Sequence, residues 1–291
     1  LTVDHGLRPE AKDETQQVRA WLSAYNIHTE ILTIEMDSTS GIQEQARAMR
    51  YNVLTRYCHD HDIDCLAVAH HGDDQKETLL YRLISGSGVD GLRGMDAVTD
   101  MDGLRVLRPL LSFKNIELIN FLNVIDQGYV NDPSNEKDDF TRVRIRKFMR
   151  GLSAEGLSFD RLDMFAKRMK RTHDALEWVV EKTLKNECEY LPWGGVRFDY
   201  NIFCQWPDDI AVRVLQHCFT HVRGGKYFYP RLQATEDLVS RIQQTANGCH
   251  TLHECVVLCE DGFITIGREA EAIDQNKIMI EKQICWDGRF D

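Results

Sequence analysis

The chain has 291 residues, of which 43% are hydrophobic and 28% are charged, and its formal net charge is −11. This length allows two domains, or three, each with a sizeable core. The sequence contains no apolar run long enough to span a bilayer and no signal-peptide pattern, so we expect a soluble, cytoplasmic protein. The negative net charge argues against a protein that coats nucleic acid non-specifically.

The first part of the chain alternates predicted strands and helices. LTV at the start reads as a strand, residues 10–25 as a helix, HTEILTIEM (28–36) as a strand and residues 42–61 as a helix. DCLAVAH (64–70) is a nearly continuous apolar run, typical of a buried parallel strand, and a helix follows over residues 73–86. This alternation predicts an α/β domain, a parallel sheet with helices on both faces, over residues 1–150.

The remaining elements suggest a second architecture. After a strand at 104–111 and a helix at 115–126, the pattern becomes helical over residues 159–185 and 210–222. HECVVLCEDGFITIGRE (253–269) predicts a β-hairpin that turns at Asp261 and Gly262. We therefore expect a helical domain at 151–230 and a small β-containing region at 231–291.

Positive charge is concentrated in one stretch of an otherwise acidic chain. Residues 137–171 contain 11 Lys and Arg against 5 Asp and Glu, a local charge of +6. Within it, alternation in RVRIR predicts that Arg142, Arg144 and Arg146 point the same way if the segment is extended. Arginine at this density suits phosphate contacts, and a structural ion-pair role is an equal alternative. A basic belt of this kind can hold one polyanion in one place.

The nine cysteines indicate reduced thiols. Their number is odd, they are scattered, and none forms a C-x-x-C pair. GCHTLHECVVLC offers a zinc alternative through Cys249, His253, Cys255 and Cys259. Two cysteines four residues apart on one strand face point along a row, so we favour buried small hydrophobic side chains.

The segment HHGDDQKET, residues 70–78, allows three interpretations. Asp74 with Glu77 three residues later can form a capping box at a helix N-terminus. The histidines and aspartates can bind a metal, although HHxDD matches no settled zinc spacing. Finally, Glu77 shares a helix face with both Asp73 and Asp74, and such carboxylates can hold an ammonium group.

Two other segments can contribute to the same site. Asp4-His5 and His70-His71 both follow predicted strands, and ligands of parallel sheets bind beyond the carboxyl ends of the strands. SGSGVDGLRGM (85–95) contains four glycines, which are compatible with plain turns or with close approach of backbone to a ligand. Arg47 and Arg50 share a face of the helix at 42–61.

Several motifs occur in the order seen in one enzyme family. VDHGLRPE (3–10), QARAMRY (45–51), AHHGDDQKETLLYRLISGSGVDGLRGM (69–95), LRPLL (107–111) and DPSNEKDDFTRVRIR (132–146) together resemble bacterial tRNA(Ile)-lysidine synthase. The segment TLHECVVLCEDGFITIGREA is similar to the tail of that family, in which a glycine is usual near His253. The motifs cover the first half of the chain densely, and the set is specific.

The resemblance implies an N-type ATP pyrophosphatase, also called a PP-loop enzyme. Such a ligase activates C2 of the wobble cytidine of CAU-anticodon tRNA(Ile) with ATP and Mg²⁺, and the ε-amine of free L-lysine then displaces AMP to give lysidine and form a carbon–nitrogen bond. A homodimer is a further expectation.

The resemblance also implies roles for individual residues. Asp4, His5, His70 and Asp73 are implied as catalytic, Asp74 and Glu77 as lysine-binding. Arg47, Gly86 and Gly88 are implied as nucleotide-binding, and Arg142, Arg144, Arg146 and Lys147 as tRNA-binding, with no resident metal. The helical domain at 151–230 is likewise implied to bind tRNA.

Two features depart from the family pattern. Val143 stands where the family usually has asparagine, and the phosphate loop S-G-G-x-D-S is absent. We therefore expect an N-terminally truncated chain that lacks one strand–loop–helix, roughly 30 residues or more, and is inactive in this form. Alternatives are a non-catalytic RNA-binding remnant, a metallohydrolase built on HHGDD, and another tRNA-modifying ATP pyrophosphatase such as a cytidine thiolase, which would require paired cysteines or an iron–sulfur site.

Overall fold

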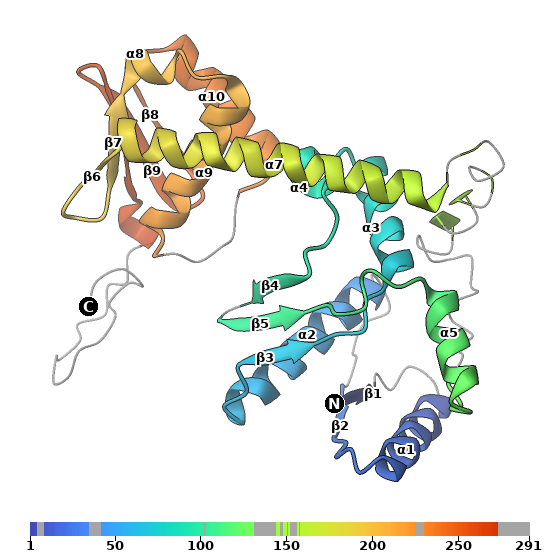
Figure 1. Ribbon diagram of the computed structural model, residues 1–291. Helices are drawn as coiled ribbons and strands as arrows, with labels where there is room; N and C mark the ends of the chain where they lie inside the picture. The colour runs from blue at the N-terminus through green and yellow to red at the C-terminus, as the bar shows by residue number, and fades with distance from the viewer. Residues whose placement is uncertain are drawn as a thin grey trace, which may run out of the picture. The chain divides into compact units, whose positions relative to one another are not determined.

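The computed structural model describes residues 1–4, 9–34, 42–101, 103–130, 144–145, 148–149, 151, 156, 158–224 and 230–272. It divides into two compact units, Leu1–Lys170 and Arg171–Asp291. The boundary falls within one helix, α7 (Phe159–Glu187), which belongs to both units (Figure 1). The domain limits at residues 150 and 230 remain predictions.

The first unit confirms the α/β class. Its elements are β1 (Thr2–Asp4), α1 (Pro9–Ala24), β2 (Ile31–Thr33), α2 (Ile42–Asp60), β3 (Cys65–Ala67), α3 (Gly72–Ile84), α4 (Val89–Leu92), β4 (Val98–Met101), β5 (Leu104–Leu107) and α5 (Asn115–Val124). The parallel strands fall into two sheets, β1–β2 and β3–β5, and β4 pairs antiparallel with β5. Strand β4 was not among the predicted elements.

Helix α2 joins the two sheets through one apolar cluster. Leu54 and Cys58 of α2 pack against Leu66 of β3 and Leu104 of β5, and Val3, Leu32 and Val68 pack against the same cluster. Burial of each such side chain contributes about 1.5–3 kcal/mol. The ends of β1 and β3, which precede the polar segments at residues 5 and 70, are therefore held by the same apolar cluster.

A second cluster attaches the start of α7 to the first unit. Leu79 and Leu80 of α3 pack with Ile145 and Met149 and with Leu162 and Ala166 of α7. Leu162 and Ala166 are four residues apart, so they lie on one face of the helix. This apolar face of α7 is what brings the helix against α3.

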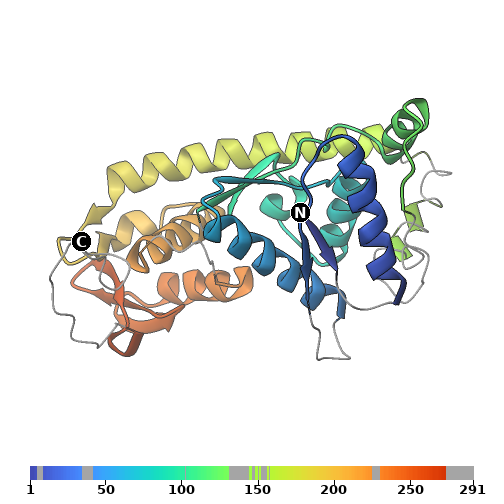
Figure 2. The ribbon, with the colours of Figure 1, turned by 90° about the horizontal axis from the view of Figure 1, so that it is seen from below.

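The second unit is a five-stranded antiparallel sheet with helices packed against it (Figure 2). Its elements after α7 are β6 (Glu189–Tyr190), β7 (Val196–Asp199), α8 (Tyr200–Phe203), α9 (Asp208–Val222), α10 (Leu232–Gln244), β8 (Gly248–Leu252), β9 (Cys255–Glu260) and β10 (Phe263–Arg268), with strand order β6-β7-β10-β9-β8. The predicted hairpin is confirmed, with Asp261 and Gly262 both at positive φ between β9 and β10.

The core of the second unit uses alternate residues of β9. Cys255, Val257 and Cys259 are buried with residues of α9 and α10. Cys255 and Cys259 are thus small core side chains, as predicted, whereas Cys249 is exposed. Buried Arg213 of α9 donates to Glu177 of α7 at 2.8 Å, which ties the end of α7 to this core.

Candidate active site at the start of helix α3

The helix that carries HHGDDQKET begins earlier than predicted. Helix α3 starts at Gly72, and His71 is the N-cap. The His71 Nδ1 accepts from the Asp73 N–H at 3.2 Å, and the Asp74 Oδ2 accepts from the His71 N–H at 3.0 Å. The predicted capping box of Asp74 and Glu77 is therefore wrong, and the box lies three residues upstream.

The shift has a tertiary cause. The Gly72 N–H donates to the carbonyl oxygen of Phe113 at 2.7 Å, and a Cβ on Gly72 would lie only 3.0 Å from that oxygen. Glycine lets the chain approach residue 113 this closely, and the first helical turn then begins at residue 72. Local sequence signals do not contain this contact.

The three carboxylates of the segment lie in different surroundings. Asp74 is occupied in part by the cap, and Asp73 accepts from the N–H of Asn115 at 2.7 Å, which ties α3 to the start of α5. Glu77 is only 3% exposed, one turn from buried Leu80. A buried carboxylate interacts with a positive charge more strongly than an exposed one, because less solvent screens the pair.

His70, between β3 and α3, is a neutral imidazole at pH 7. Burial lowers the pKa of His70 to about 4; the Asp74 carboxylate opposes this shift, and the positive charges of nearby arginines, Arg47, Arg108 and Arg50, add to it. Its Nδ1 is buried and receives no hydrogen bond from the part of the chain that the structure describes. Such an atom is satisfied most simply by a bound ligand or water.

The other predicted site residues are placed as follows. Asp4 ends β1, and its neighbour Val3 packs on the same apolar cluster as Val68. The Arg47 guanidinium lies 5.4 Å from the ring centroid of Tyr51. Its positive charge is one of those that lower the pKa of His70. Arg144 is exposed. His5, Arg142, Arg146 and Lys147 lie outside the described residues.

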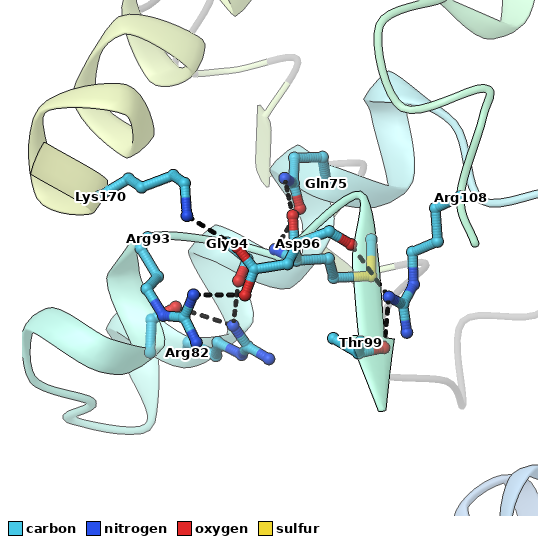
Figure 3. A network of polar contacts seen from close by, with 10 residues as sticks. Gln75, Arg82, Arg93, Gly94, Asp96, Thr99, Arg108 and Lys170 are labelled. Carbon is cyan, nitrogen blue, oxygen red and sulfur yellow. Dashed lines mark hydrogen bonds and ion pairs between the residues drawn. The ribbon is translucent and has the colours of Figure 1, made fainter. Parts of the chain in front are cut away.

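Gly86 and Gly88 follow the far end of α3, about 20 Å along the helix from His70. The glycine-rich segment then turns back along α3, and its end is held beside the first turns of the helix (Figure 3). The Gln75 amide forms two hydrogen bonds with the backbone of Met95, at 2.8 and 2.6 Å. The returning residues, and not the two predicted glycines, approach the site.

A network of charged side chains fixes this returning segment (Figure 3). Arg82 of α3 donates to the carbonyl oxygens of Gly91 and Gly94 at 2.9 and 2.8 Å. Asp96 forms ion pairs with Arg93 and Lys170, and buried Arg108 donates to the Asp96 carbonyl oxygen at 2.9 Å. Arg108 therefore links the network to the electrostatic surroundings of His70.

Sequence reasoning did not identify this network. Arg82 lies in LLYRLI, where one arginine interrupts apolar residues, and Arg108 precedes a proline in LRPLL. A charged residue inside an apolar run is a signal of a buried polar partner. That signal predicts that a polar partner exists, but it does not identify which backbone carbonyl oxygen accepts the hydrogen bond.

Comparison with known proteins identifies residues 1–151 as a PP-loop domain. A tRNA(Ile)-lysidine synthase from Ruegeria pomeroyi is 32% identical over 99% of this chain and 68% of its own length. The enzymes of the same name from the Wolbachia of Brugia malayi and from Anaplasma marginale are 30% and 33% identical over the whole chain, which spans 68% and 63% of them. The solved structure of the U34-tRNA thiolase NcsA from Methanococcus maripaludis, with its 4Fe-4S cluster, gives a TM-score of 0.48 over 57% of this chain and 59% of that chain, at 16% identity.

The fold and the match over the first half define the class: the chain is a member of the PP-loop family of ATP-using proteins. Within that class it belongs to the tRNA(Ile)-lysidine synthases, which are tRNA-modifying ligases. Across the described ranges, none of the helices is both long and apolar enough to cross a bilayer.

Proposed function

We propose that this chain carries the lysine-binding and tRNA-binding parts of a cytoplasmic tRNA(Ile)-lysidine synthase. The reaction adenylates the C2 oxygen of the wobble cytidine with ATP and releases diphosphate. The lysine ε-ammonium first loses one proton to solvent, so that its nitrogen has a lone pair. The ε-amine then forms a bond to C2, the bond from C2 to the adenylate oxygen breaks, AMP leaves, and the nitrogen loses a second proton. The substrates are CAU-anticodon tRNA(Ile), L-lysine and ATP.

The observation that carries the proposal is the grouping of His70, Asp74 and Glu77 at the start of α3 in a chain of this family. Glu77 is buried, and the cap occupies only one oxygen of Asp74. Together these carboxylates can accept hydrogen bonds from an ammonium group. Two anionic side chains bind a cationic substrate more strongly than two neutral side chains would. We assign lysine binding to Asp74 and Glu77.

We assign the proton transfer to His70, with Asp73 as the second candidate. His70 is neutral at pH 7 because its pKa is about 4, so it has a lone pair available. Although this makes it a weak base, the amine nitrogen becomes acidic once it has bonded to C2, and a weak base can then accept its proton. The buried Nδ1 that lacks a hydrogen-bond partner among the described residues suits a group that contacts substrate.

The remaining assignments concern anionic groups. We place Arg47 with the nucleotide, and Arg142, Arg144, Arg146 and Lys147 together with the helical region at 151–230 with tRNA. Gly86 and Gly88, about 20 Å along α3 from His70, do not share this site. We assign Asp4, which ends β1, and His5, the next residue in the sequence, to the catalytic site. Asp4 offers an oxygen of the kind that Mg²⁺ prefers, and most ligands of that ion come from the ATP phosphates and water. A homodimer remains a prediction that sedimentation velocity tests.

The testing experiment is ATP-dependent incorporation of labelled lysine into a CAU-anticodon tRNA(Ile) transcript. Because the sequence contains no S-G-G-x-D-S loop, we expect incorporation only by a version extended upstream to include that loop. If the extended protein also fails while it still binds the transcript, the chain is a non-catalytic RNA-binding protein. Stoichiometric zinc, manganese or iron in the purified protein would favour a metallohydrolase.

The lysine assignment has its own test in the extended protein. Glu77→Gln should raise the KM for lysine by about 10- to 100-fold, the loss expected for a hydrogen bond to a charged group. Glu117→Gln is the matched control, because Glu117 is an exposed carboxylate that caps α5 by accepting from the Lys114 N–H. An unchanged KM for lysine in Glu77→Gln would refute the assignment.

A further inference from the structure

The loop formed by residues 87–96 is held by side chains from two elements adjacent to it in the fold. Gln75 and Arg82 of α3 bind the backbone of Gly91, Gly94 and Met95. Arg108, which follows β5, binds the carbonyl oxygen of Asp96 and the hydroxyl of Thr99, both at 2.9 Å. These contacts fix the path of the backbone, and none of them uses the Asp96 carboxylate.

The Asp96 carboxylate makes a different kind of contact. Its Oδ1 lies 3.0 Å from Nζ of Lys170 and its Oδ2 pairs with Arg93, as Figure 3 shows. Burial alone would raise the pKa of Asp96, but the hydrogen bonds and charges of Lys170 and Arg93 lower it below its usual range. The carboxylate is therefore ionised at neutral pH and holds two cations, one from the loop itself and one from α7.

The position of Lys170 follows from the packing of α7. Lys170 is four residues beyond Ala166 and eight beyond Leu162, so all three lie along one stripe of the helix. Leu162 and Ala166 are buried against Leu79 and Leu80 of α3. The apolar contact thus places the Lys170 ammonium beside Asp96, which is 74 residues away in sequence.

The same helix leads out of the first unit. Lys170 is the last residue of that unit, and α7 continues from Arg171 to Glu187. Residues on this continuation belong to the part of the chain to which we assign tRNA binding. The loop contacts α7 through Leu92, at the apolar cluster of Leu162 and Ala166, and through the Asp96 ion pair with Lys170, and of these two contacts the ion pair is the one nearer to the second unit.

We propose that Asp96 is a positioning residue, whose ion pair with Lys170 couples α7 to the loop at residues 87–96, so that tRNA engaged by α7 and the residues after it stabilises the loop beside the candidate active site. The coupling to tRNA rests on the proposed function. The ion pair itself does not, since it is a property of the free protein.

Hydrogen–deuterium exchange of the loop amides tests the ion pair directly. In the free chain, Lys170→Met should speed exchange over residues 87–96 by on the order of fivefold, the loss expected for a partly exposed ion pair. Lys170→Arg should restore the wild-type rate. The matched control is Lys167→Met, because Lys167 pairs at 2.7 Å with Asp163 of the same helix and not with the loop.

The same measurement with the tRNA(Ile) transcript tests the coupling. Wild type and Lys170→Arg should show slower loop exchange when tRNA is bound, and Lys170→Met should bind tRNA, as measured by fluorescence anisotropy, without this protection. In the extended protein, Lys170→Met should lower kcat and leave the KM for tRNA unchanged, whereas a general loss of structure would alter both.

These measurements distinguish the role of the ion pair in the free protein from its coupling to bound tRNA. Wild-type exchange over residues 87–96 in free Lys170→Met would overturn the ion-pair coupling whatever tRNA does. Equal tRNA-induced protection in wild type and Lys170→Met would overturn the coupling to tRNA. Absence of transcript binding by wild-type protein would contradict the proposed function, and the free-protein comparison would still decide the role of Asp96.

Discussion

His70 shows how a single residue can make stability depend on pH. Its folded pKa of about 4 lies below the ordinary value of 6.5, so between these values the unfolded chain binds the proton and the folded protein does not. The free energy of unfolding should therefore be highest above pH 6.5 and fall as the pH drops toward 4. The shift corresponds to about 3 kcal/mol at most, and partial solvent exposure reduces it.

Replacement of His70 should remove this dependence. His70→Asn should give a flatter profile between pH 7 and 4, measured by urea denaturation at several pH values. His59→Asn, at an exposed position near the end of α2, is the control and should follow wild type. If His70→Asn keeps the wild-type slope, the titration responsible belongs to another group.

At the scale of elements, two glycines of one loop allow a paired prediction. Gly94 has a φ of +80°, and a Cβ there would lie 2.9 Å from the Gln75 amide that binds Met95. Gly88 has a φ of −75°, and no described heavy atom lies within 4 Å of its Cβ position. Only the first position therefore needs glycine for the fold.

We expect Gly94→Ala to lower the free energy of unfolding of the first unit by about 1–3 kcal/mol, because it adds backbone strain and displaces Gln75. Gly88→Ala should change it by less than about 0.5 kcal/mol or stabilise slightly. Thermal and urea denaturation of both variants measures the difference. Equal effects would mean that the Gln75 contact does not constrain the loop.

The elements also show which sequence signals succeed. Long periodic helices such as α7 and α9, and the hairpin with Asp261-Gly262, follow local patterns and were predicted. Helix α10 was missed because its sequence, LQATEDLVSRIQQ, is polar apart from a narrow stripe that includes Leu238 and Ile242. The start of α3 was misplaced because the contact between Gly72 and Phe113 is tertiary.

For the whole molecule, the fold class and the grouping on α3 could be derived from the sequence, because both depend on residues near one another in the chain. The separation of the parallel strands into two sheets could not, since strand pairing depends on long-range contacts. The interactions of Asp96 were equally inaccessible, because its partner Lys170 is 74 residues away.

Helix α7 contributes to the cores of both units, which leads to a selective prediction. Leu162→Ala should lower the stability of the first unit by about 3 kcal/mol, because it removes a buried side chain from the cluster of Leu79 and Leu80. Hydrogen exchange should show faster global exchange before residue 171 and little change after it. Met164→Ala, at a 45% exposed position of the same helix, is the control.

The packing of Leu79 and Leu80 against α7 also imposes an order on biosynthesis. Their partners Leu162 and Ala166 are translated more than 80 residues later, which takes about 4 to 17 s at 5–20 residues per second. During that interval a nascent chain would present two adjacent leucines on an already helical segment. Nascent chains stalled before residue 162 should therefore be the ones that bind chaperones, and release should coincide with emergence of the first turns of α7.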